Sequence, residues 1–315
     1  MEKKIKKKFH LRKDDMELTL LSLPTIIWFF VFSYLPMFGI IIVFKKFRIV
    51  DGQKSFLYNL LKSDWAGLSN FKFLLESRDM RIIVRNTLVY NLIFILLGII
   101  IPVTLALLIS QIRSKRAKKL YQTAMLFPHF MSWVVVTYFV WAFLSYEDGF
   151  INHILLQLGK EPIQWYMEGT HWPFILVFMN VWKGAGYGMI IYLAAITGID
   201  PSYYEAAVID GASIRQQVRF ITLPLIKTII IMMFILNIGS IFYSDFGLFY
   251  QITQDSNSLY DKTIVLDVYV YKALRENGNI GMASAASFIQ SVLSCCLVLI
   301  TNKIVTKLDA ESALI

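Results

Sequence analysis

Long uncharged stretches dominate this sequence and indicate its fold class. Four stretches of 26 or 27 residues contain no Asp, Glu, Lys or Arg: residues 18–44, 86–112, 120–146 and 277–302. A helix rises 1.5 Å per residue, so about 20 apolar residues cross the roughly 30 Å hydrocarbon core of a bilayer. Each stretch is therefore long enough to form a membrane-spanning helix.

Two further stretches could also span the membrane, although each contains or adjoins a lysine. Residues 170–199 are long enough but carry Lys183 near their middle. Residues 228–244 number only 17, and they become long enough as 223–244 if Lys227 extends its ammonium to the interface. With these two, the pattern predicts an all-α membrane protein with six transmembrane helices.

Charge on the short connections predicts the orientation. Seven Lys or Arg lie in the first 13 residues and five in the link 113–119, and both segments should be cytoplasmic because positive charge favours that side. Loops 147–169 and 245–276 carry more acids than bases, so we expect them outside. Six spans then place both termini in the cytoplasm, as tails 1–17 and 303–315. The external acids Asp245, Asp255, Asp261 and Asp267 are expected to face a delivery protein or, taken singly, only solvent.

One loop opposes this orientation. Residues 45–85 carry nine Lys or Arg against four acids, yet the alternation of spans places them outside. The orientation predicted here follows the N-terminal tail and the link 113–119, which together place residues 45–85 outside. Apolar residues suggest that this loop forms short interfacial helices: Phe56, Leu57, Trp65, Phe71, Phe73 and Leu74.

Composition agrees with a membrane protein. Of 315 residues 57% are hydrophobic and 17% charged, below the roughly 25% charged that is usual in soluble domains. The net charge of +9 follows from the cytoplasmic clusters, so it gives no reason to expect a nucleic-acid partner. Cys295 and Cys296 are adjacent within an apolar run, which suits packing rather than metal binding or cross-linking. The first apolar run is longer than a signal-peptide core, so we expect it to remain as a span.

The connection between the fourth and fifth predicted spans, residues 200–222, carries a spaced motif. It reads E-A-A, three residues, G, nine residues, I-x-L-P, at Glu205, Ala206, Ala207, Gly211, Ile221, Leu223 and Pro224. We expect a short helix over 204–209, a left-handed stop at Gly211 and a new helix opened by Pro224. A helix with a small-residue face suits the groove of another protein. The alternative is a capped interfacial turn that binds nothing.

This motif matches the signature loop of binding-protein-dependent ABC importer permeases at every fixed position, and the chain resembles that family. Further stretches resemble its carbohydrate-type members, especially the polysaccharide-type branch related to maltose-type permeases: residues 34–39, 86–88, 127–133, 182–184, 192–203 and 244–250. Relatives often carry a proline shortly after Pro224, where this chain has Lys227.

The resemblance implies a type I ABC importer permease core in the plasma membrane of a bacterium. The short helix would be the coupling helix, seated in a cleft of the ATPase, where the position matching Glu205 contacts basic residues. The expected ATPase-coupling residues are Tyr204, Glu205, Ala206, Ala207, Asp210, Gly211, Leu223 and Pro224.

The resemblance also implies partners. These are two cytoplasmic ATPase subunits, an extracellular, lipid-anchored solute-binding protein, a carbohydrate substrate and a second homologous permease, although the chain could also pair with itself. No G-x-x-x-x-G-K-[ST] occurs in the sequence, so we expect ATP and Mg on the partner ATPase and no cofactor or metal in this chain.

Polar residues inside the spans are candidates for the substrate pathway. A Lys at mid-membrane costs roughly 3 kcal/mol and usually faces a cavity or a partner. Asn180, Lys183, Gly184 and Tyr187 follow a spacing that puts them on one helix face. An amide, a cation and an aromatic ring suit the hydroxyl edges and apolar faces of sugars, and in maltose-type permeases the corresponding stretch lines the sugar site. Alternatively, Lys183 reaches the interface or pairs with another subunit.

Two weaker sets follow. Asn237, Ser240 and Ser244, with Tyr243 adjacent, form a polar stripe in the fifth span, and His129 lies one turn from Trp133 in the third. Both sets could instead serve helix packing. The glycine-rich stretch 184–188 lacks a dinucleotide-loop context and suggests close helix packing or a cavity.

The sequence therefore favours a permease subunit that imports a carbohydrate, most simply an oligosaccharide, by alternating access. A permease of the same superfamily for a non-sugar solute, such as an amino acid or phosphate, is the first alternative. A membrane-embedded enzyme is the second. With four histidines and no paired carboxylates in a span, no catalytic group assembles for the enzyme.

Overall fold

The computed structural model describes residues 13–48, 55–72, 78–276 and 278–308. Within these ranges the chain is helical apart from its connections and one isolated β-bridge between Lys45 and Trp65. Residues 1–12 and 309–315 of the two predicted tails lie outside the described residues, as do Phe73 and Leu74 of the basic loop.

Five helices of the described chain are long and apolar enough to cross a membrane: Met16–Phe44, Asp79–Ser110, Trp172–Thr197, Ile214–Gly239 and Ile280–Lys307. The first is formed by α1 (Lys13–Phe29), η1 (Phe30–Tyr34) and η2 (Leu35–Phe44), and the others centre on α4 (Arg78–Ser110), α8 (Trp172–Thr197), α11 (Leu223–Gly239) and α14 (Ile280–Leu308). A bent helix pair, Lys115–Phe130 with Trp133–Leu144, passes the same test of length and hydropathy and counts as the sixth span when the two helices are taken together. The all-α, six-span fold is thus confirmed, while the side on which the termini lie stays a prediction.

The third predicted span is not one continuous helix. It consists of α5 (Lys115–Phe130) and α6 (Trp133–Leu144), whose axes meet at 98°. Met131 and Ser132 between them are extended, and the Ser132 hydroxyl accepts a hydrogen bond from the Val135 N–H at 3.3 Å. A serine in this conformation starts a new helix by satisfying a free N–H group. The 27-residue uncharged stretch concealed this break, because hydropathy does not register a cap.

Pro224 lies in the first turn of α11, as the sequence predicted, but the fifth span that contains α11 begins ten residues earlier, at Ile214. Its first turns are α10 (Ile214–Gln217) and the π-helical η4 (Val218–Thr222). Ser213 and Gln216 form a capping box at its start. Pro224 lacks an N–H and its ring crowds the preceding turn, and the wider π turn just before it accommodates both defects. Residues 214–222 of the predicted loop 200–222 therefore belong to the fifth span.

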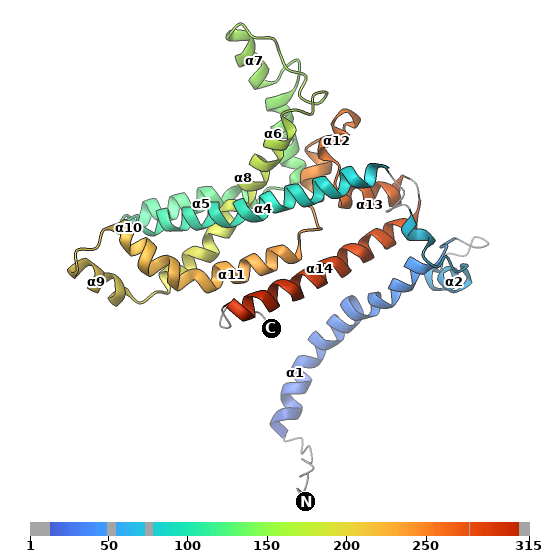
Figure 1. The fold of residues 1–315 in the computed structure, drawn as a ribbon, viewed down its shortest axis with the longest axis horizontal. Helices are drawn as coiled ribbons and strands as arrows, with labels where there is room; N and C mark the ends of the chain where they lie inside the picture. The colour runs from blue at the N-terminus through green and yellow to red at the C-terminus, as the bar shows by residue number, and fades with distance from the viewer. Residues whose placement is uncertain (1–12, 49–54, 73–77, 277, 309–315) are drawn as a thin grey trace, which may run out of the picture.

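The closest helix packing is around α8. It packs most extensively against α4 and next against α5 (Figure 1). A Cβ added to Gly186 would lie 1.9 Å from the Met125 carbonyl oxygen, and one added to Gly188 would lie 3.0 Å from Cγ of Pro102. The expectation that this glycine-rich stretch permits close packing is confirmed.

Two hydrophobic cores divide the bundle. One, around Ile83, Trp172 and Phe249, joins α4, α6 and α8 to the short helices of the chain's later third: η5 (Gly247–Gln251), η6 (Asn257–Leu259), α12 (Tyr260–Thr263) and α13 (Leu266–Arg275). The other, around Ile109, Met189, Ile196 and Ile226, joins α4, α8 and α11. α9 (Pro201–Ile209) lies at the end of the bundle near the core around Ile109 and Ile196, and α12 and α13 lie at the end near the core around Ile83 and Phe249 (Figure 1).

The remaining elements flank this bundle. α7 (Phe150–Gln157) follows α6, and α2 (Phe56–Lys62) with η3 (Ser69–Phe71) lies in the basic loop after the first span. Buried Lys45 donates from Nζ to the carbonyls of Leu60 (2.7 Å) and Leu61 (3.1 Å), so it closes the end of α2. The first span packs against α14 mainly through η2, and α1 stands away from the bundle (Figure 1).

Candidate functional site

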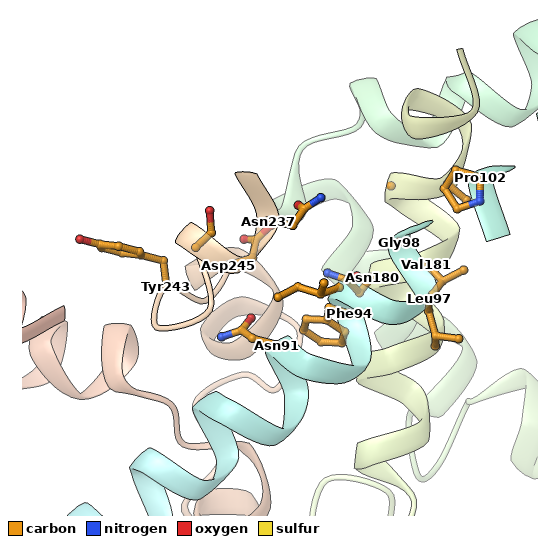
Figure 2. Close-up of a pocket in the computed structure, with 14 residues that line it drawn as sticks. Asn91, Phe94, Leu97, Gly98, Pro102, Asn180, Val181, Asn237, Tyr243 and Asp245 are labelled. Carbon is orange, nitrogen blue, oxygen red and sulfur yellow. The ribbon is translucent and has the colours of Figure 1, made fainter. Parts of the chain in front are cut away.

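A cleft of about 270 Å³ lies between the two cores, near the middle of α4 and α8. Figure 2 shows α4 and α8 forming one wall and the end of α11 with residues 240–245 forming the other. Its polar lining comes from Asn91, Asn180, Asn237, Ser240, Tyr243 and Asp245. Phe94, Leu97, Pro102 and Val181 supply apolar surface. A polar cleft at mid-helix is costly in a membrane and is therefore expected to serve a function.

The amides of the cleft differ in how far their bonds are satisfied. Asn91 donates to the Ile241 carbonyl at 2.9 Å and to Ser244 Oγ at 3.0 Å, which ties α4 to the segment after α11. Asn237 donates to the Met233 carbonyl of its own helix at 2.7 Å. Asn180 makes no hydrogen bond to any described residue. Its amide is therefore the cleft group with the most unused capacity for a ligand.

Asp245 is held firmly in the cleft wall. Its Oδ2 accepts from Trp133 Nε1 at 2.7 Å, and its Oδ1 accepts from the N–H groups of Gly247 (2.9 Å) and Leu248 (3.4 Å). These N–H groups begin η5, where a carboxylate is favoured by the free donors of a helix start. The sequence placed Asp245 in a solvated external loop, whereas the structure makes it part of the site.

The predicted face of α8 divides into two groups. Asn180 and Gly184 line the cleft, and a Cβ at Gly184 would meet no atom within 4 Å. Lys183 and Tyr187 instead face the break between α5 and α6. Lys183 Nζ donates to the His129 carbonyl at 3.0 Å, and the Tyr187 and His129 rings stack with centroids 4.5 Å apart.

Lys183 therefore has an internal role at the break. The last carbonyls of a helix have no partner in that helix, and a cation there is favoured by the helix dipole. The ammonium also lies 5.0 Å from the centroid of the Trp133 ring, and Trp133 in turn binds Asp245. Lys183 is thus connected through Trp133 to a wall of the cleft rather than lining the cleft itself.

The predicted stripe of the fifth span is only partly in the cleft. Ser240 lines it, whereas Ser244 accepts from Asn91 and donates its N–H to Asp267 Oδ2 at 2.6 Å. The Tyr243 ring is directed away from the other labelled side chains in Figure 2, and its hydroxyl pairs with Ser291 of α14 at 2.9 Å. Burial raises the pKa of Asp267, against the hydrogen bonds from Ser244 and Gln290.

The predicted coupling segment forms an exposed helix. Asp200 caps α9 by accepting from the Ser202 N–H at 2.9 Å, which lowers the pKa of its carboxyl. Gly211 ends the turn after α9 with φ +75°, the left-handed conformation that the sequence predicted. Glu205, Ala206 and Asp210 are exposed, and Ala207 is half-buried. Ile209 is 86% exposed, so the described chain leaves an apolar tip uncovered.

Of the remaining coupling candidates, Tyr204 joins this helix to the fifth span. The Tyr204 hydroxyl lies 2.9 Å from Oγ1 of buried Thr222 in η4. Leu223 packs against the second core, and Pro224 is exposed on the span itself. Leu223 and Pro224 thus belong to the helix that α9 contacts, not to the exposed peg.

Three lining residues, Asn91, Phe94 and Asp245, were not predicted from the sequence to line the pathway. Asn91 was visible as an amide within an uncharged stretch, but so was Asn86, which binds the carbonyls of Asp261 and Ile264 and does not line the cleft. Nothing in the sequence distinguished Phe94 from the other apolar residues of its span. Among the described residues, no group of three or more His, Cys, Asp or Glu could hold a metal ion.

Comparison with known proteins agrees with this geometry. The family described as binding-protein-dependent transport system inner membrane component matches residues 95–308. The polygalacturonan/rhamnogalacturonan transport system permease protein YteP of Bacillus subtilis (strain 168) is 33% identical, over 93% of this chain and 89% of that protein. Protein LplB of the same strain is 33% identical, over 95% of this chain and 91% of that protein.

Solved structures agree as well. A crystal structure of a bacterial ABC transporter involved in the import of the acidic polysaccharide alginate contains a chain with a TM-score of 0.83 and 31% identity, covering 94% of this chain and 97% of that chain. A structure of a bacterial alginate ABC transporter in complex with an alginate pentasaccharide-bound periplasmic protein gives a TM-score of 0.82. The resemblance drawn from residues 205–224 is confirmed. The chain belongs to the binding-protein-dependent transport system inner membrane components, as a multi-pass permease of the bacterial plasma membrane.

Proposed function

We propose that this chain is the permease subunit of an ABC importer and that it carries an oligosaccharide through the cleft between α4, α8 and α11. The observation that carries the proposal is the Asn180 amide, which has no hydrogen-bond partner among the described residues and lies at mid-helix in a polar cleft. Names and structures of relatives support a saccharide cargo, since they include polygalacturonan, rhamnogalacturonan and alginate systems.

The lining fits a sugar better than an amino acid or phosphate. Amides and a serine hydroxyl can both donate to and accept from sugar hydroxyls, and Phe94 offers an aromatic ring for an apolar sugar face. A phosphate would call for a cation in the lining, and among the described lining residues Asp245 is the one charged group. The non-sugar alternative is therefore disfavoured by the charge of the cleft.

The exposed helix α9 is proposed as the docking element for a separate ATPase. Its uncovered apolar tip at Ile209, next to Glu205 and Ala206, suits insertion into another protein's groove. ATP and Mg would bind to two such ATPase subunits, and this chain would hydrolyse nothing itself. This places α9 and the basic link 113–119 in the cytoplasm, in agreement with the positive-inside rule.

Two further partners complete the proposed importer. A second, non-identical permease would form the opposite wall of the pathway, and the stand-off of the first span in Figure 1 leaves much apolar surface for it and for lipid to cover. An extracellular, lipid-anchored binding protein would deliver the saccharide at the end that carries α12 and α13.

Transport by the reconstituted importer tests the proposal. Proteoliposomes containing the permease pair, the ATPase and the binding protein would be assayed with a panel of neutral and acidic oligosaccharides. Asn180→Leu removes the free amide at similar volume, and Thr104→Val on α4 is the matched control, since Thr104 is exposed outside the cleft and bonds only its own helix. We expect uptake to fall at least tenfold in Asn180→Leu and to persist in Thr104→Val.

Two results would count against the proposal. Normal uptake by Asn180→Leu would show that the cleft is not part of the transport pathway. Uptake of amino acids or phosphate, with none of any saccharide, would favour the non-sugar alternative while leaving the importer assignment intact.

A further inference from the structure

A second groove lies between α5 and α8, at the end of the bundle that carries α9. It has a volume of about 510 Å³ and lies apart from the polar cleft, with which it shares no lining residue. Its lining consists of Lys118, Lys119, Gln122, Thr123 and Leu126 from α5 and Ile190, Leu193, Ala194 and Thr197 from α8. We call it the α5–α8 groove.

The polarity of this groove changes steadily along its length. On α5 it runs from two lysines through an amide and a hydroxyl to Leu126, and on α8 from Thr197 through Ala194 to Ile190. Seven residues separate the ends on each helix, or roughly 10 Å at 1.5 Å per residue. That is within the roughly 15 Å depth of one leaflet of the hydrocarbon core.

The charged end of the groove is uncompensated. Lys118 and Lys119 form no ion pair within the described chain, and neither α5 nor α8 contains an Asp or Glu. Arg113, Lys115 and Arg116 add positive charge nearby. An anion is therefore the favoured occupant of this end, whereas Leu126 and Ile190 at the other end would be solvated poorly by water.

From these observations we infer that the α5–α8 groove binds one anionic phospholipid. Its phosphate lies on the ammonium groups of Lys118 and Lys119, its glycerol region lies near Gln122 and Thr123, and an acyl chain follows Leu126, Leu193 and Ile190. A soluble phosphate would use the first part of the groove alone. An acidic protein surface would leave the apolar part empty, so the graded lining favours the lipid.

The site has a mechanical consequence. Thr197 at the groove mouth is three residues before Asp200, which caps α9, and Gly186 holds α8 against α5 just beyond Ile190. A bound lipid therefore bridges α5 and α8 beside the helix proposed to receive the ATPase. We expect anionic lipid to raise the ATPase activity that depends on transport, as well as to bind.

Native mass spectrometry of the detergent-purified importer complex, titrated separately with phosphatidylglycerol and phosphatidylcholine, tests the inference. We expect one saturable phosphatidylglycerol adduct per copy of this chain. In K118Q/K119Q its affinity should fall roughly 10- to 30-fold, from the loss of two charges near the membrane surface. The control K115Q/R116Q removes two neighbouring charges that do not line the groove and should bind almost normally.

A third variant separates a lipid from a bare anion. Ile190→Trp fills the apolar end without altering charge, and it should also weaken the adduct. Retention of the adduct in Ile190→Trp together with its competition by inorganic phosphate would reveal an anion site only and overturn the inference. Equal binding of both lipids, or equal losses in K118Q/K119Q and K115Q/R116Q, would overturn it too. So would loss of the ATPase from K118Q/K119Q with unchanged lipid binding, since the lysines would then serve protein docking.

Discussion

Replacing Gly186 with alanine should destabilise the protein through one contact between α5 and α8. The added Cβ would lie 1.9 Å from the Met125 carbonyl oxygen, 2.3 Å from its carbon and 2.8 Å from the Leu126 nitrogen. All three are backbone atoms, so no side-chain rotation relieves the clash. The helices must separate by more than 1 Å, and overpacking of this kind costs about 1–3 kcal/mol or more.

The neighbouring glycine provides a matched control on the same helix. A Cβ at Gly184 meets nothing within 4 Å, so Gly184→Ala changes only the intrinsic preference for helix, which favours alanine by about 1 kcal/mol. Gly188→Ala should fall between them, because its Cβ approaches only the Pro102 ring, at 3.0 Å. The expected order of stability is Gly184→Ala, then Gly188→Ala, then Gly186→Ala.

Thermal unfolding in detergent, followed by size-exclusion of the heated sample, measures this order. The gap between Gly184→Ala and Gly186→Ala should be about 2–4 kcal/mol, or several degrees in the unfolding midpoint. Equal midpoints would refute the view that Gly186 is required for the approach of α5 to α8. A larger loss in Gly184→Ala would refute the placement of Gly184 at an open cleft.

Three further predictions follow from the site and its supports. Lys183→Met should lower both the unfolding midpoint and uptake, because the His129 carbonyl loses a hydrogen bond from a charged donor worth about 1.5–3 kcal/mol. Lys183→Arg should retain more of both. Unchanged stability of Lys183→Met would contradict this role. Tyr204→Phe loses the hydroxyl contact with Thr222, so it should reduce transport-coupled ATPase activity more than it reduces docking of the binding protein. An equal loss of ATPase activity and of docking would indicate general misfolding. The pKa of Asp267 is raised, so protonated Asp267 stabilises the folded state, and this contribution is lost as the pH rises from about 3.8 through the raised pKa. Asp267→Asn should flatten that part of the plot of unfolding free energy against pH. An unaltered plot would disprove the role of Asp267.

The spans were predictable because hydropathy alone decides whether a segment enters the membrane. Their interruptions were not. Ser132 starts α6 just after the break through a single hydrogen bond, and the π turn before Pro224 lets a helix continue where a proline suggested a start. Such local bonds leave the average hydropathy of a window unchanged. The short helix at α9 was predictable, in contrast, because Gly211 and the adjacent Ala206 and Ala207 signal it directly.

Charge was a weaker guide within the basic loop. Lys45 was counted as topological charge, yet it is buried and donates to the carbonyls that end α2. A lysine used in this way carries little information about which side of the membrane it occupies. Part of the conflict between residues 45–85 and the rest of the chain thus has a structural cause, although only the described residues of that loop bear on it.

The division of the α8 face shows what spacing could not decide. Asn180, Lys183, Gly184 and Tyr187 share one face of a helix by their spacing, but α8 has neighbours on both sides of that face. α4 and the end of α11 meet Asn180 and Gly184, while the break after α5 meets Lys183 and Tyr187. Periodicity gives the direction of a side chain from its own axis and says nothing of the partner found there.

Both walls of the cleft are connected to α9. α8 carries Asn180 and runs through Thr197 directly into α9, so a displacement of α9 acts on that wall through continuous backbone. The opposite wall carries Asn237 on α11, and α11 is continuous with η4, which Tyr204 of α9 contacts at Thr222. The backbone therefore joins α9 to both walls, through residues 198–200 to α8 and through residues 210–213 to α10 and the fifth span, and the Tyr204 hydroxyl adds a hydrogen bond to the second connection. Loss of the Tyr204 hydroxyl should therefore loosen the connection between α9 and the wall that carries Asn237 without unfolding either wall.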